Sequence, residues 1–156
     1  MRVILDTNIL CSALLTPGGP TDQLYRAWRD KRFVLLTSEE QLEEFRRITR
    51  YPRVKAFIEP AASGTMHNEL RHVAVVLERL PAVEQSQDPA DNFLLAMAES
   101  GNADFLVTGV KHGLLSLGTF RSTRIVTARQ MLERLGEKKK RPRRLPGRAA
   151  RRARRK

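Results

Sequence analysis

Short runs of apolar residues alternate along this chain with longer segments in which apolar residues recur at helical spacing. The short runs predict buried strands, which are expected at residues 3–5, 33–36, 80–83, 105–107 and 124–126. The longer segments predict helices, which are expected to begin at residue 21 and to span residues 8–15, 39–50, 53–59, 65–79, 89–100, 114–117 and 128–135. Strands that alternate with helices predict an α/β domain built on a mostly parallel sheet.

The composition is that of a single folded domain. A chain of 156 residues, of which 41% are hydrophobic and 29% charged, is long enough to bury a core. Cys11 is the single cysteine and no Cys/His cluster indicates zinc, so a reducing, cytoplasmic location is expected. No apolar stretch approaches the roughly 20 residues that span a membrane, and Asp6 interrupts the first apolar run, which argues against a signal peptide.

Most of the positive charge lies at one end of the chain. The net charge is +12, and residues 136–156 contribute +11 of it through twelve Lys or Arg and one acid. This segment is rich in Lys, Arg and Pro and has Leu145 as its one large apolar residue, which predicts disorder in isolation. The expected organisation is a folded domain at residues 1–135 and a disordered basic tail at residues 136–156.

Two acidic residues stand at positions that favour a site. Asp6 directly follows the first predicted strand, and open α/β sheets bind ligands at the carboxyl ends of their strands. Asp6 can equally cap the helix that follows. Glu44 falls at the border of the apolar stripe of helix 39–50, where a carboxylate can face inward from the rim of the core.

A second pair of acids flanks the start of helix 89–100. Asp88 can be the N-cap of this helix, Pro89 its first residue and Asp91 its N3 acid, which explains all three without any function. Helix N-termini in this topology nevertheless share an edge of the sheet with Asp6. The structural and the functional interpretation of these two carboxylates therefore both remain open.

The convergence of Asp6, Glu44 and Asp91 would require a cation. Carboxylates at short range raise one another's pKa values, and a divalent ion removes that cost. Oxygen ligands without a nearby His or Cys favour Mg²⁺ or Mn²⁺ over zinc. Such an ion keeps open positions for phosphate oxygens and can activate a water for phosphodiester hydrolysis.

Several motifs in this chain are similar, in order and spacing, to those of the PIN-domain family. They are VILDTNIL at residues 3–10, SEEQLEEF at 38–45, DPADNFLLA at 88–96, ADFLVTG at 103–109 and RIVTARQML at 124–132. The resemblance extends over about residues 1–135 and is strongest to bacterial PIN proteins described as toxin components of toxin–antitoxin systems. It implies a three-layer α/β/α fold with a five-stranded, mostly parallel sheet. It also implies a Mg²⁺- or Mn²⁺-dependent endoribonuclease that cleaves single-stranded RNA.

The resemblance assigns roles to individual residues. The catalytic, metal-binding acids of the family map onto Asp6, Glu44 and Asp91. Asn8 and Thr108 would be supporting polar groups near the metal. The family further implies a small cognate antitoxin that blocks the site, and dimerisation, which occurs in many of its members.

One position departs from the family pattern. After Val-Thr-Gly the family often has a fourth acid or Asn, whereas this chain has Val110, which cannot bind a metal. Three interpretations follow: Asp88 substitutes for the missing group, three acids suffice, or catalysis is weak or lost.

The basic tail is expected to attract RNA backbones without sequence preference. It has no aromatic residue for base stacking, so base readout is not expected. A solvated extension that only raises solubility is the alternative. The candidate RNA-binding residues are Lys138, Lys139, Lys140, Arg141, Arg143, Arg144, Arg151, Arg152, Arg154 and Arg155.

Two other functions remain as alternatives to the nuclease. A catalytically weak or inactive PIN module would bind RNA or an antitoxin through its basic tail. A phosphoacceptor signalling domain would be modified at Asp6, but such a site needs paired acids near the first strand, and here Thr7 and Asn8 follow Asp6.

Overall fold

The computed structural model describes residues 1–86, 88–109 and 113–139. Within them, a six-stranded sheet has the order β3-β2-β1-β4-β6-β5. The strands are β1 (Arg2–Leu5), β2 (Val34–Ser38), β3 (Val75–Leu77), β4 (Phe105–Val107), β5 (Thr119–Phe120) and β6 (Thr123–Val126). The helices are α1 (Thr7–Leu15), α2 (Pro20–Arg29), α3 (Glu39–Thr49), α4 (Pro52–Lys55), α5 (Pro60–His72), α6 (Pro89–Gly101), α7 (Leu114–Leu117) and α8 (Ala128–Lys139).

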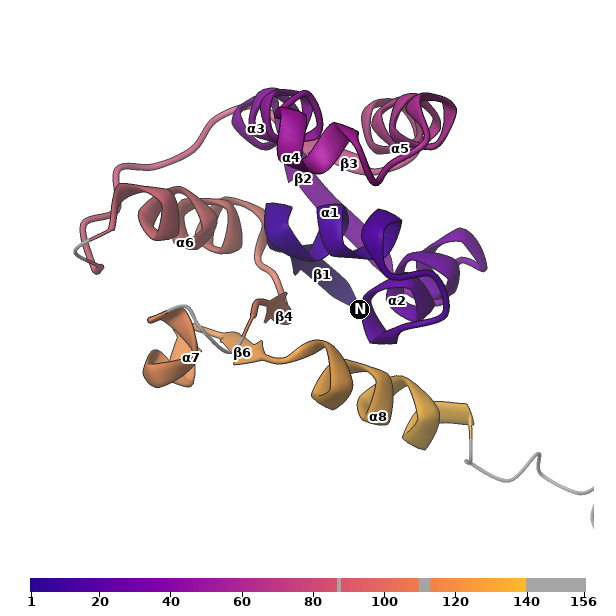
Figure 1. Cartoon of the computed structure of the whole chain (residues 1–156). Helices are drawn as coiled ribbons and strands as arrows, with labels where there is room; N and C mark the ends of the chain where they lie inside the picture. The colour runs from indigo at the N-terminus through magenta and orange to yellow at the C-terminus, as the bar shows by residue number, and fades with distance from the viewer. Residues whose placement is uncertain (87, 110–112, 140–156) are drawn as a thin grey trace, which may run out of the picture.

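Helices cover both faces of the sheet, which confirms the predicted three-layer α/β/α fold (Figure 1). Side chains on β1 alternate between the two faces, as in any strand. Val3 and Leu5 pack in a cluster with residues of α1, α2, α3, α5 and α8. Ile4 packs in a second cluster with residues of α6. The protein therefore has a core on each side of the sheet.

All neighbouring strands pair in parallel except β5, which is antiparallel to β6. The prediction of a mostly parallel sheet is therefore correct, whereas the expected number of five strands is one too low. β5 consists of Thr119 and Phe120 alone, which is too short to register as an apolar run. Parallel pairing brings the carboxyl ends of β1, β2, β4 and β6 to one edge of the sheet.

The third strand and the helix before it lie elsewhere than predicted. The helix expected at residues 65–79 is α5, which begins at Pro60 and ends at His72, and residues 80–83 form no strand. β3 is made of Val-Val-Leu at residues 75–77, and Val75 aligns with Leu36 of β2. β-branched residues favour strands, and pairing with β2 outweighs the helical spacing of the apolar residues.

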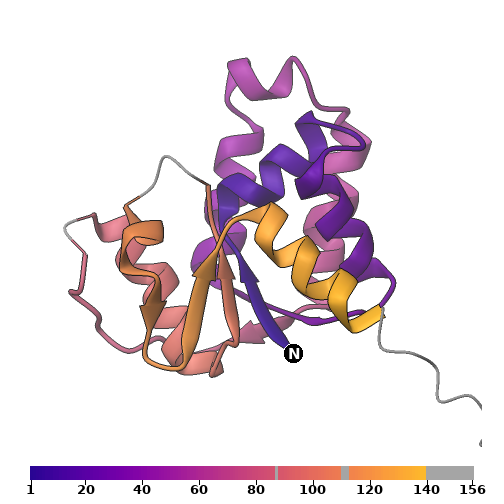
Figure 2. The same cartoon turned by 90° about the horizontal axis from the view of Figure 1, so that it is seen from below.

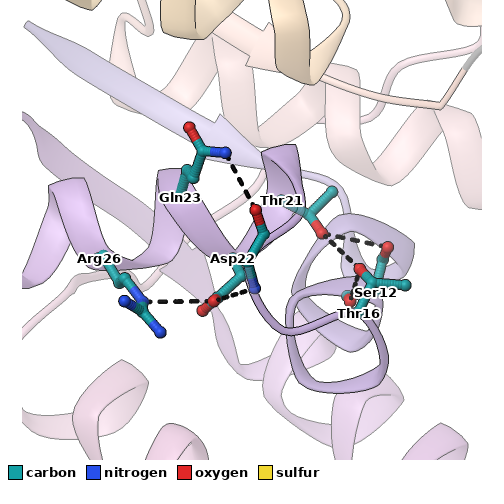
Figure 3. Close-up of polar contacts among 7 residues, drawn as sticks. Ser12, Thr16, Thr21, Asp22, Gln23 and Arg26 are labelled. Carbon is teal, nitrogen blue, oxygen red and sulfur yellow. Dashed lines mark hydrogen bonds and ion pairs between the residues drawn. The ribbon is translucent and has the colours of Figure 1, made fainter.

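The connection between α1 and α2 is held by polar side chains (Figure 3). The buried carboxylate of Asp22 accepts a hydrogen bond from the Gly18 N–H at 2.8 Å and forms an ion pair with Arg26 at 3.2 Å. Gly18 has a φ of 80°, in the left-handed region that glycine adopts without strain. The hydroxyls of Thr21 and Ser12 lie 3.1 Å apart and link the two helices directly. These contacts hold α1, the helix that follows Asp6, against α2.

Helix α8 continues four residues beyond the predicted end of the domain. It is joined to the body by the Arg32 guanidinium, which donates to the Leu135 carbonyl at 2.8 Å. Residues 140–156 of the predicted tail lie outside the described residues. No helix in the described part of the chain is both long and apolar enough to cross a membrane.

Candidate functional site

Asp6 lies directly after β1, at the carboxyl edge of the sheet, and is 5% exposed. One carboxylate oxygen accepts a hydrogen bond from the Asn8 N–H at 3.3 Å, so Asp6 is the N-cap of α1. The other oxygen accepts a hydrogen bond from the Thr108 hydroxyl at 2.9 Å. Thr108 is fully buried and follows β4, the strand next to β1. Two neighbouring strand ends therefore fix the orientation of one buried carboxylate.

Glu44 lies on α3 and is half-buried, as its place at the border of the apolar stripe predicts. Burial raises the pKa of its carboxyl above the usual value, and the negative charge of Asp6 raises it further. The Thr7 hydroxyl and the Arg47 guanidinium act in the opposite direction and lower this pKa. Asp6 and Glu44 are therefore close enough for their charges to interact.

Thr7, between Asp6 and Asn8, is a site residue that the sequence analysis missed. Its side chain is fully buried, and its hydroxyl, although near Glu44, forms no well-oriented hydrogen bond within the described residues. A buried hydroxyl whose hydrogen bonding is incomplete costs free energy that a bound polar group can recover. In the sequence, a threonine at the start of a helix gives no signal of this kind.

Asp88 and Asp91 lie at the start of α6. The Asp88 carboxylate accepts a hydrogen bond from the Ala90 N–H at 2.9 Å, so the predicted N-cap is confirmed. Asp91 lies in the first turn of the helix and is 6% exposed. Because α6 ends at Gly101, shortly before β4 begins, its N-terminus points to the edge of the sheet where Asp6 lies.

The segment before α6 is shaped by two residues that the sequence analysis did not single out. Asn92 accepts a hydrogen bond from the Ser86 N–H and donates one to the Ser86 carbonyl, both at 2.8 Å. The Ser86 hydroxyl in turn lies 3.4 Å from a carboxylate oxygen of Asp91. This loop therefore helps to orient the buried carboxylate of Asp91.

A family model described as a PIN domain matches residues 2–112 of the chain, a range that includes Asp6, Glu44 and Asp91. The chain belongs to the PIN-domain family. PIN domains are metal-dependent nucleases as a family, and the acids at the carboxyl edge of this PIN domain agree with that chemistry. No curated protein matches the chain significantly.

The donor set of this PIN domain suits a hard cation. In the described part of the chain, no three Asp, Glu, His or Cys side chains lie close enough to hold a metal ion together. The pair of Asp6 and Glu44 is nevertheless enough for Mg²⁺, which proteins usually hold through one or two carboxylates while water fills the remaining positions. The nearby Thr7 hydroxyl adds a further oxygen.

The remaining predicted residues of this PIN domain divide into two groups. Asn8 is exposed on the first turn of α1 beside Asp6, and Lys138 and Lys139 are the last residues of α8. The second group lies outside the described residues and consists of Val110 and the tail residues Lys140, Arg141, Arg143, Arg144, Arg151, Arg152, Arg154 and Arg155.

Proposed function

We propose that this PIN domain is a Mg²⁺- or Mn²⁺-dependent endoribonuclease that hydrolyses single-stranded RNA and acts as the toxin of a toxin–antitoxin pair. One observation carries the proposal: the buried Asp6 carboxylate, oriented by Thr108 at the carboxyl edge, lies close enough to Glu44 to add to the rise that burial causes in the pKa of Glu44. A fold that keeps two repelling carboxylates together, in a family of nucleases, favours a cation between them.

The metal ion would be held by Asp6 and Glu44, and Asp91, which forms no three-acid cluster with them among the described residues, would lie at the same edge of the sheet. When bound, it would lower the pKa of a water and stabilise the charge that develops on the phosphodiester. The protein supplies orientation: Thr108 holds Asp6 at 2.9 Å, and the loop at Ser86 holds Asp91. Asp6 and Asp91 each expose about one-twentieth of their surface. This burial strengthens the hydrogen bonds that Thr108 and Ser86 donate to the two carboxylates.

RNA would be drawn to this acidic edge by charge elsewhere in the molecule. The tail contributes +11, and a positive segment raises the local concentration of RNA. A small antitoxin that covers the carboxyl edge would block access to the acids, and association of two copies of the chain is compatible with the proposal.

Replacing Asp6 by Asn tests the cleavage chemistry. Asn is as good an N-cap as Asp but carries no charge, so the fold is retained while a metal ligand is lost. With Mg²⁺ or Mn²⁺ and a labelled single-stranded RNA, we expect Asp6→Asn to reduce the cleavage rate about 100-fold or more. Equal cleavage by Asp6→Asn and the wild type would refute the proposal.

A matched pair of variants on α3 controls for effects of net charge alone. Glu43 is exposed and adjacent to Glu44, so Glu43→Gln and Glu44→Gln change the net charge equally. We expect Glu44→Gln to lose cleavage and Glu43→Gln to retain it within about twofold. Similar losses in both variants would count against a specific role for Glu44.

The sequence also supports a second function, because Val110 occupies the position where the family often has an acid or Asn. A PIN module without catalysis would bind RNA or an antitoxin through its basic tail. It would show salt-dependent RNA binding but no cleavage with either ion. In that case Val110→Asp is the variant in which we expect cleavage to appear.

A further inference from the structure

A pocket of about 380 Å³ lies among helices α3, α4 and α5. Its volume is in the range of sites for small ligands. Two buried apolar side chains, Phe45 and Ile58, line it. Three exposed cationic side chains, Arg46, Arg50 and Lys55, also line it. The pocket thus combines an apolar floor with a cationic rim.

This pocket is separate from the acids at the carboxyl edge. Along a helix each residue turns by about 100°, so Arg46 and Arg50 project from the side of α3 opposite to Glu44. In Figure 2, α3, α4 and α5 extend beyond the end of the sheet where β1 finishes. The pocket therefore belongs to a helical projection next to the candidate site.

The positive charge of the pocket is not balanced by acids. Its lining contains no Asp or Glu, and Arg46, Arg50 and Lys55 form no ion pair within the described residues. Nearby Arg71, in contrast, is paired with Glu39 at 2.9 Å. Three cations without an acidic partner around one cavity create a local field that attracts an anion.

His67, which also lines the pocket, is affected by the same field. Burial lowers the pKa of its imidazole, and the charges of Arg46 and Arg71 lower it further. Its ring stacks on the ring of Phe45 with centroids 6.4 Å apart. His67 therefore adds a half-buried ring, whose charged form is disfavoured, to the wall of a cationic pocket.

Gly64 leaves one wall of the pocket open. It lies within α5, where glycine costs about 1 kcal/mol relative to alanine. A Cβ atom built at Gly64 would meet no atom within 4 Å, so packing does not explain the glycine. The missing side chain leaves room for a bound group beside α5.

We propose that this pocket binds a nucleotide phosphate. Arg46, Arg50 and Lys55 hold the phosphate oxygens, and the apolar floor at Phe45 and Ile58 receives the sugar or base. The nucleotide is either free in solution or one unit of an RNA strand, because both present the same phosphate ester. This binding needs neither a metal ion nor cleavage at Asp6.

A pair of charge reversals tests the proposal in the full-length protein with EDTA present. Arg50 lines the pocket, whereas exposed Arg53 on α4 does not, so both changes to Glu alter the net charge equally. Adenosine monophosphate and a five-nucleotide single-stranded RNA are titrated by calorimetry. We expect Arg50→Glu to weaken binding at least about tenfold and Arg53→Glu by less than about threefold.

A variant that fills the pocket keeps the test independent of charge and of any misfolding that Arg50→Glu causes. Gly64→Leu fills the cavity without adding charge, and Ala61→Leu, at an exposed position of α5 that does not line the pocket, is its control. We expect Gly64→Leu to weaken binding as strongly as Arg50→Glu, while Ala61→Leu binds like the wild type. Thermal melts of all variants check that the fold is retained.

The outcomes separate the two sources of the nucleotide. Weaker binding of both ligands in Arg50→Glu and Gly64→Leu assigns the pocket to an RNA strand, and weaker binding of the mononucleotide alone assigns it to a free nucleotide. Unchanged binding of both ligands overturns the proposal. Since no metal is present, the result does not depend on whether Asp6→Asn abolishes cleavage.

Discussion

Asp6 serves both the fold and the candidate site through one carboxylate. One oxygen caps α1 through the Asn8 N–H, and the other accepts the Thr108 hydroxyl. The structural and functional interpretations of Asp6 are therefore compatible, because each oxygen keeps a further lone pair beside the hydrogen bond that it accepts. Helix N-termini stabilise negative charge, which offsets part of the repulsion between Asp6 and Glu44.

The pKa of the Cys11 thiol depends on the two acids of the candidate site. Burial raises its pKa to about 12, and the charges of Glu44 and Asp6 contribute to the rise. Because the folded pKa lies above the unfolded value, the stability that this group contributes is present below the unfolded pKa and lost as the pH rises toward 12. We expect the native thiol to react with a thiol reagent at pH 8 at least about 100-fold more slowly than the unfolded chain.

The same thiol tests whether the two acids lie near it. Removing one negative charge by Asp6→Asn or Glu44→Gln should lower the pKa of Cys11, measured by thiolate absorbance as the pH is raised. Glu43→Gln, whose side chain is exposed, should leave it unchanged. An unchanged Cys11 pKa in both site variants would mean that the charges do not reach the thiol.

At the scale of elements, two helical glycines have opposite surroundings. Gly64 in α5 faces open space, whereas a Cβ at Gly101, the last residue of α6, would lie 2.5 Å from Leu36 Cδ1. Both Cδ atoms of Leu77 would lie 3.3 Å from the same position. Gly101 therefore allows α6 to approach β2 and β3 closely. No such close approach exists at Gly64 in α5.

This contrast predicts that replacing glycine by alanine changes the free energy of unfolding in opposite directions at Gly64 and Gly101. We expect Gly64→Ala to raise the free energy of unfolding by about 0.5–1 kcal/mol, because alanine restricts the unfolded chain and favours helix. We expect Gly101→Ala to lower it by about 1–3 kcal/mol, because buried Leu36 must move. Urea denaturation measures both changes, and equal signs would contradict the packing at Gly101.

At the scale of the whole molecule, charge is distributed very unevenly. Residues 1–135 carry a net charge of +1 and residues 136–156 carry +11. The acids of the candidate site lie in the near-neutral body, where they would repel RNA without a cation. Attraction of RNA and cleavage of RNA are therefore expected to depend on different parts of the chain.

Removing residues 140–156 should separate these two properties. The deletion removes ten Lys or Arg and no acid. Every phosphate that the tail neutralises on a single strand steepens the fall of log affinity with log salt by about 0.7. We expect the deletion to give a smaller salt slope and weaker RNA binding, with an unchanged cleavage rate at saturating RNA. An unchanged salt slope, measured by filter binding at several salt concentrations, would show that the tail does not bind RNA.

Much of the fold could be predicted from local patterns. Four of the five predicted strands lie within one or two residues of β1, β2, β4 and β6, because each is a short apolar run bounded by turn or cap residues. The helix starts at Ser38 and Asp88 were correct because a capping side chain binds a neighbouring N–H. β3 was misplaced because its pairing partner, β2, is remote in sequence.

Local residue patterns were enough to predict which chemistry this protein offers: acids after apolar runs, caps at helix starts and a basic tail. Those properties depend on residue type and on neighbours within about one helical turn. Three features arise only when the chain is folded. Thr108 contacts Asp6, 102 positions away in the sequence, and Thr7 is buried beside Glu44. Cations without acidic partners among the described residues surround one pocket. Such contacts depend on how strands and helices pack, and burial then sets how strongly the charges interact.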